Sequence, residues 1–126
     1  MKQMLVVLLL LGLSVTLVAQ VPTGAVTLRG YVVDARCGAA MAGKPTGAVR
    51  AARHTKACAL DEACAAAGYG VFAEGKWVKF DARGDVLAKA AIRASKKERG
   101  HYCEVRGSMR GEQFAVVSLK ERTEKK

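Results

Sequence analysis

The sequence predicts a small, mainly β domain of the α+β class, in which five strands form a barrel and helices interrupt them at two points. Three observations carry this prediction. Five short segments alternate apolar and polar residues as strands do; an alanine-rich, helix-forming segment follows the first of them; and an amphipathic segment separates the third from the fourth. This is the element order of an OB-fold, a Greek-key barrel, here with a helical insertion between strands 1 and 2.

The first half of the domain contains one strand and the insertion. Residues 27–34 (TLRGYVVD) alternate well enough for a strand, and the glycine-rich residues 38–47 predict a loop. Residues 48–67 are rich in Ala, Arg and Lys, which favour helix, and Gly68 is a natural C-terminal stop. We therefore expect the insertion to be helical up to Gly68.

The second half contains a hairpin, a helix and two more strands. Residues 69–81 give two strand patterns around a turn at Glu74 and Gly75, and residues 85–95 predict an amphipathic helix with Asp85 at its N-cap. Residues 101–109 and 112–119 give the last two strands around Arg110 and Gly111. The expected organisation is a single OB-like domain over residues 20–120 and a charged tail over residues 121–126.

The N-terminal residues predict a secretory signal peptide over residues 1–19. Lys2 supplies a positive charge, residues 4–18 are apolar, and the small Ala19 offers a cleavage point. The apolar run is slightly short for a membrane span, so an uncleaved anchor is the lesser alternative. This segment is the only part of the chain that we expect to insert into a membrane. The signal predicts a periplasmic or secreted protein, in which cysteines tend to form disulfides.

The chain is strongly basic, with a formal charge of +10 over 126 residues. Such a charge attracts polyanions, and for an exported protein an anionic cell-envelope polymer or lipid headgroups are expected partners, while nucleic acid is not. Basic and aromatic residues interleave on the expected strands, and the candidate ligand face consists of Arg29, Tyr31, Trp77 and Lys79. The alternative is that Trp77 and Tyr31 pack beneath the inserted helix.

The stretch HTKACALDEAC, residues 54–64, places His54, Cys58 and Cys64 in one run. In one continuous helix, Cys58 and Cys64 would be separated by about 9 Å of rise, too far for a disulfide. Either the helix breaks at Leu60 and Asp61, where Asp61 could cap a new turn, or each cysteine has a partner elsewhere. Disulfides between Cys37 and either Cys64 or Cys58 are expected, with the remaining cysteine bonded to Cys103 or left free.

A metal site is the alternative to disulfides. His54 and Cys58 lie four residues apart, on one face of a helix, and with Cys37 and Cys64 they would form a Cys₃His set suited to Zn²⁺ or Cu(I). No cofactor is expected if the cysteines are bridged. A reactive thiol is a third reading, since His101 stands two residues from Cys103, but the sequence has no C-x-x-C motif.

The motifs GYVVDARCG, H-x₃-C-x₅-C and GYGVFAEGKWVKFDARGD together resemble a group of small exported bacterial proteins of uncharacterised function. The resemblance implies a secreted, compact, β-rich domain with Cys37, His54, Cys58 and Cys64 as its marked positions, and it implies no reaction. Cys103 departs from the pattern, which implies a buried free thiol there.

Taken together, these features predict an exported, non-enzymatic, disulfide-stapled β-barrel module that binds an anionic or polymeric ligand of the cell envelope. The alternative prediction is a periplasmic protein that binds Zn or Cu.

Overall fold

The computed structural model describes residues 24–125 of the chain, so the expected signal peptide lies outside the described residues. The elements follow in the order β1 (Val26–Asp34), α1 (Ala35–Met41), α2 (Gly47–Ala52), α3 (Lys56–Leu60), α4 (Glu62–Ala66), β2 (Tyr69–Ala73), β3 (Lys76–Phe80), α5 (Ala82–Ala94), β4 (Tyr102–Arg110) and β5 (Gln113–Glu121). No helix within residues 24–125 is long and apolar enough to cross a bilayer.

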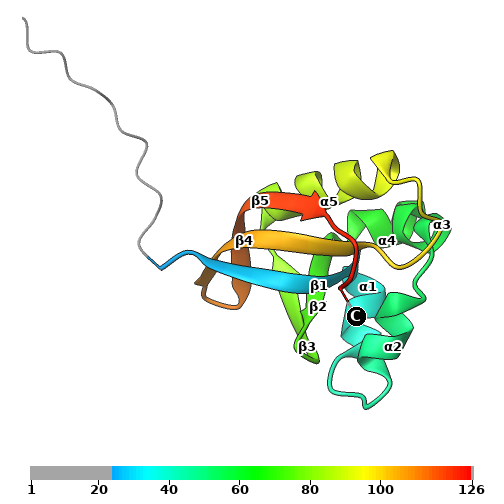
Figure 1. The fold of residues 1–126 in the computed structure, drawn as a ribbon, viewed down its shortest axis with the longest axis horizontal. Coiled ribbons are helices and arrows are strands. Elements are labelled where there is room, and N and C mark those ends of the chain that lie inside the picture. The colour runs from blue at the N-terminus through cyan, green and yellow to red at the C-terminus, as the bar shows by residue number, and fades with distance from the viewer. Residues whose placement is uncertain (1–23, 126) are drawn as a thin grey trace, which may run out of the picture.

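The five strands form one mixed sheet that closes into a ring, in the order β1-β2-β3-β5-β4 with β4 pairing back to β1 (Figure 1). All neighbours are antiparallel except β3 and β5, which pair in parallel. The α+β class and the expected five strands are confirmed. The helical segments also fall where they were expected, between β1 and β2 and between β3 and β4.

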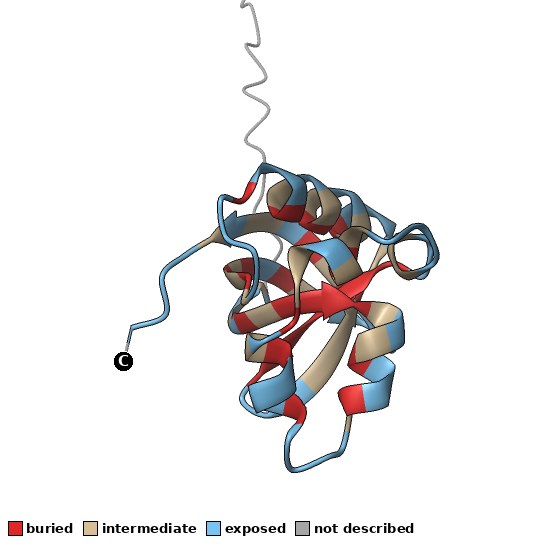
Figure 2. Cartoon of the chain, turned by 90° about the vertical axis from the view of Figure 1, so that its right-hand side faces the viewer, coloured by how far each residue is buried: buried red, intermediate tan, exposed pale blue. Residues whose placement is uncertain are grey.

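The ring has an apolar interior because its strands alternate. Val32, Val71 and Val105 point inward, where they meet Phe80 and Phe114 in the main core. The outward side of β1 and β2 is covered by α1 and α2, which form a second, smaller cluster of Val33, Met41, Ala51 and Phe72. Figure 2 shows buried residues concentrated on the strands and on the inward sides of the helices.

The segment after β1 is helical, so the predicted loop over residues 38–47 is partly wrong. Asp34 ends β1 and caps α1 by accepting a hydrogen bond from the Cys37 N–H. Gly38 sits within α1 against the ring of Trp77, and a Cβ at this position would lie only 2.3 Å from that ring. The glycine therefore allows α1 to contact the indole of Trp77. The glycine-rich composition of residues 38–47 did not indicate this contact.

The segment expected to be one helix, residues 48–67, is divided among three short helices, α2, α3 and α4. After α2 the chain is extended at Thr55, which pairs with Arg99 in an isolated bridge, and Thr55 then caps α3. A second break follows Leu60, where Asp61 caps α4 through hydrogen bonds from Ala63 and Cys64. The break at Leu60 and Asp61 confirms one of the two arrangements predicted from the cysteine spacing.

Helix α5 begins three residues earlier than expected, with Asp81 as its N-cap in place of Asp85. The Asp81 carboxylate accepts hydrogen bonds from Gly84 in the first turn and from Val116 in β5. Asp85 instead accepts a hydrogen bond from the Tyr69 N–H and lies 3.1 Å from Lys79 Nζ. One carboxylate thus ties the helix start to β5, and the other ties its first turn to β2 and β3.

The substitution Asp81→Ala is expected to lower the free energy of unfolding by about 1–3 kcal/mol, because it leaves the Gly84 and Val116 N–H groups without an acceptor. Urea denaturation followed by circular dichroism measures the change. Glu112→Ala, at an exposed turn residue, is the control, and equal effects of the two substitutions would contradict the assignment of Asp81 as the cap.

Candidate metal centre

One carboxylate and three thiols meet at the end of the ring where β1 runs into α1. One ligand atom from each of Asp34, Cys37, Cys58 and Cys64 lies within 4.8 Å of all the others. Asp34 is fully buried, whereas the three cysteines are half-buried. The Asp34 end of the group is therefore buried, whereas solvent can reach the side formed by the cysteines.

The same local structure positions each of the three cysteines. Each is the third residue of a short helix, and its N–H donates to the side chain of the N-cap residue three positions earlier. The pairs are Asp34 and Cys37 in α1, Thr55 and Cys58 in α3, and Asp61 and Cys64 in α4. Three capped helix starts thus bring three thiols to one point.

This arrangement has a sequence signal that the spacing of His54, Cys58 and Cys64 does not reveal. The pattern of a capping residue, two residues and a cysteine occurs three times, as DARC, TKAC and DEAC. The pattern identifies Asp34 and the helix starts, and it shows why a single helix was the wrong framework for residues 54–64. Asp34 was not among the predicted site residues, because it was taken only as the end of a strand.

The distance between two of the sulfur atoms suits a shared tetrahedral ion. Cys37 Sγ and Cys58 Sγ are 3.8 Å apart. Two thiolates at about 2.3 Å from a tetrahedral Zn²⁺ would be separated by about 3.8 Å, whereas a disulfide needs about 2.05 Å. None of the four cysteines in the described residues is at disulfide distance from another.

His54 does not join the set of four but contacts its carboxylate. Its Nε2 atom lies 3.0 Å from Asp34 Oδ2, and its side chain is only 5% exposed. Apart from this close contact, Asp34 Oδ2 and both ring nitrogens of His54 have no hydrogen-bond partner within residues 24–125. Such buried atoms without a hydrogen-bond partner are rare in native proteins, and one of them, Asp34 Oδ2, belongs to a residue of the cluster.

The negative charge of Asp34 disfavours thiolates beside it. Burial raises the pKa of Asp34, but the contact with His54 and the hydrogen bond from the Cys37 N–H outweigh this effect and leave the pKa below its ordinary value. Burial, followed by the negative charge of Asp34, raises the pKa of Cys37 to about 12 and also raises that of Cys64. Without a nearby cation, Cys37 and Cys64 therefore keep their protons at neutral pH.

Cys103 and His101 lie outside this site. Cys103 is buried in the main core, and its Sγ contacts the His101 carbonyl oxygen at 3.6 Å. His101 is also buried, and its Nδ1 is 3.4 Å from a Glu121 carboxylate oxygen. Burial lowers the pKa of His101 and raises that of Cys103 to about 12, so the Cys103 thiol keeps its proton at neutral pH.

The structure does not gather the four candidate ligand-face residues. Trp77 packs against α1 and Phe72, and Tyr31 packs against Tyr102 and the second core cluster. Lys79 turns toward Asp85. Arg29 alone among them remains open, with its side chain 60% exposed beside Glu104.

The unfolding free energy of the metal-free, reduced protein is expected to depend on Asp34 ionisation. Because its pKa is lower in the folded state, ionised Asp34 stabilises the fold above its unfolded pKa of about 3.9, and this contribution is lost as the pH falls through the folded pKa. The stability difference between wild type and Asp34→Asn should therefore narrow as the pH falls from about 6 to about 3. Glu112→Gln is the control, and a gap that stays constant over this range would contradict the assignment.

No family model, curated protein or solved structure matches the chain.

Proposed function

We propose that this protein binds one Zn²⁺ ion through the thiolates of Cys37, Cys58 and Cys64 and the carboxylate of Asp34. The observation that carries the proposal is the convergence of three thiols and a buried carboxylate within 4.8 Å. Two sulfur atoms already stand 3.8 Å apart, the edge of a zinc–thiolate tetrahedron. The set differs from the predicted Cys₃His set, since Asp34 takes the place of His54.

The donor set favours Zn²⁺ over Cu(I). Zinc accepts sulfur and oxygen ligands together in tetrahedral geometry, whereas Cu(I) selects soft sulfur ligands and gains little from a carboxylate. Three thiolates and a carboxylate carry four negative charges, which a divalent ion offsets better than a monovalent one. His54, in contact with Asp34, would orient the carboxylate toward the metal.

The role that fits this site is structural. Helices α1, α3 and α4 have only 7, 5 and 5 residues, which is too short for independent stability. A metal held by one side chain from each of them and by the last residue of β1 would fix the whole insertion to the ring. The half-buried cysteines leave a route by which the ion could enter.

A disulfide between Cys37 and Cys58 is the second candidate for the same residues. Their sulfur atoms are 3.8 Å apart, and an exported protein would meet an oxidising environment. The bridge would leave Cys64 as a free thiol and would prevent a three-thiolate site. Metal binding and this disulfide are therefore alternative states of one cluster.

The finer fold and the location of the protein also belong to this proposal. We infer that the ring is an OB-like barrel, supported by its strand order and by the helix between β3 and β4. We propose that residues 1–19 direct export, which the apolar run after Lys2 supports. In this proposal the protein is not an enzyme.

Reduced, purified protein is expected to bind one equivalent of Zn²⁺ in native mass spectrometry. Cys37→Ser, Cys58→Ser and Cys64→Ser should each weaken binding by about tenfold or more, because each removes a ligand. Cys103→Ala is the matched control and should keep the full stoichiometry, since Cys103 lies in the core. Equal loss in Cys103→Ala and Cys58→Ser would overturn the assignment, as would wild-type protein that takes up no zinc.

Air oxidation of the metal-free protein is expected to link Cys37 to Cys58, because their sulfur atoms are only 3.8 Å apart. Peptide mapping after thiol blocking would identify the bridge, and prior loading with Zn²⁺ should slow its formation. A dominant bridge to Cys103 would contradict the geometry of the site. Bridge formation at the same rate with and without zinc would show that the metal does not occupy these thiols.

A further inference from the structure

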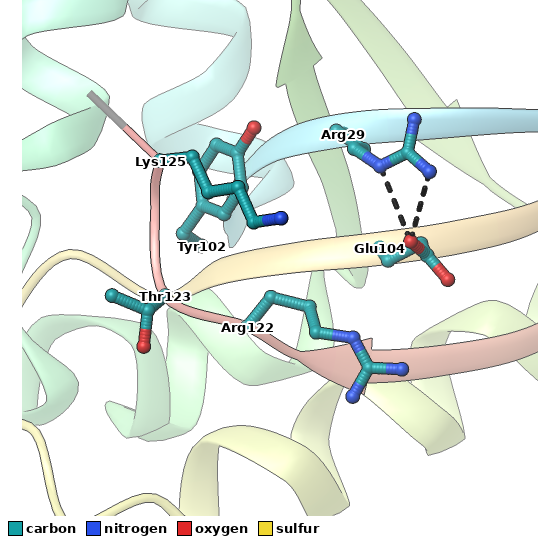
Figure 3. Close-up of a pocket in the computed structure, with 6 residues that line it drawn as sticks. All are labelled: Arg29, Tyr102, Glu104, Arg122, Thr123 and Lys125. Carbon is teal, nitrogen blue, oxygen red and sulfur yellow. Dashed lines mark hydrogen bonds and ion pairs between the residues drawn. The ribbon is translucent and has the colours of Figure 1, made fainter.

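A second potential site lies on the outer face of β1 and β4, where the segment after β5 crosses them. It is a hollow of about 450 Å³. Its lining, drawn in Figure 3, consists of Arg29, Tyr102, Glu104, Arg122, Thr123 and Lys125. This volume falls within the range of small-ligand sites.

Strand pairing and the C-terminal segment together build this hollow. Arg29 and Glu104 are opposite each other on β1 and β4, and the Arg29 side chain forms an ion pair with Glu104 at 3.1 Å. The Arg122 N–H donates to the Tyr102 carbonyl oxygen, and the Tyr31 hydroxyl bonds to the Glu124 carboxylate. These two contacts hold residues 122–125 across the strands.

The charges around the hollow favour an acidic group. Arg122 and Lys125 are exposed and form no ion pair with any other described residue. Arg29 is partly neutralised by Glu104, so the lining keeps an excess of positive charge beside an open space. A ligand carboxylate or sulfate could accept hydrogen bonds from both unpaired cations.

The remaining residues favour a ligand with hydroxyl groups as well. Glu104 would repel a densely charged polyanion but can accept hydrogen bonds from hydroxyls, and Thr123 can donate or accept them. The ring of Tyr102 offers an apolar surface on which a sugar could pack. A second hollow of about 290 Å³ adjoins the first at Arg29 and Tyr102, which suits an extended ligand.

We propose that this hollow binds an acidic saccharide chain, with its carboxylate or sulfate groups on Arg122 and Lys125 and a sugar ring against Tyr102. The proposal replaces the predicted ligand face, of which only Arg29 takes part. It shares no residue with the cysteine cluster and does not depend on zinc.

Isothermal titration with two probes tests the proposal, a heparin-derived hexasaccharide and an oligogalacturonate of similar length. At least one should bind, while neutral maltohexaose should not. The double substitution Arg122→Ala/Lys125→Ala should weaken that binding by about tenfold or more. Both residues are exposed, so the fold should persist, and circular dichroism would verify this.

The matched control is Lys76→Ala/Arg110→Ala, which removes the same charge from two exposed residues outside the hollow. It should change the affinity by less than about threefold. Equal weakening by both double substitutions would overturn the proposal in favour of diffuse charge attraction. Binding of neither acidic probe would overturn it too, as would tighter binding of single-stranded oligothymidylate of matched charge.

Discussion

The burial of the Asp34 carboxylate is the constraint that organises the cysteine cluster and the helices around it. Asp34 is the last residue of β1 and is fully buried, and a buried charge is costly unless partners compensate it. One oxygen caps α1 through the Cys37 N–H, which turns the chain from strand to helix. The other faces His54 and has no hydrogen bond within the described residues. A metal ion among the three thiols would supply the missing partner.

This constraint matters because the insertion consists of helices that are too short to be stable without tertiary contacts. Its four helices have between 5 and 7 residues each. Outside the cluster they are held by tertiary contacts: α1 and α2 form the second apolar cluster with Phe72, Ala59 of α3 lies in the main core, and Lys56 hydrogen-bonds to the segment after α5. The Asp34 cluster joins the starts of three of these helices to the end of β1. The ring, by contrast, has its own apolar core and closes without the cluster. The cluster therefore acts on the insertion more than on the sheet.

Strand alternation made the sheet predictable, and helix capping explains what was missed. Alternating residues marked all five strands, and Asp61 marked the break before α4, because both signals are local. Helix α1 was missed because glycine has a low helix propensity. Gly38 is nevertheless needed in α1, where only a residue without a side chain can contact Trp77. His54 was predicted as a ligand from its four-residue spacing to Cys58. That spacing puts two side chains on one face only in a continuous helix, and Thr55 between them is extended. Asp34 could have been found only by noticing that a capping residue precedes three cysteines at the same interval.

The zinc X-ray absorption spectrum of the loaded, reduced protein is the sharpest test of a site built from Asp34 and three cysteines, because it reports which atoms surround the metal. We expect three sulfur ligands at about 2.3 Å and one oxygen ligand at about 2.0 Å. Asp34→Asn should alter the oxygen shell and leave the three sulfur ligands in place. A spectrum with four sulfur ligands, or with no sulfur at all, would contradict the claim that Asp34 and the three capped cysteines form one site.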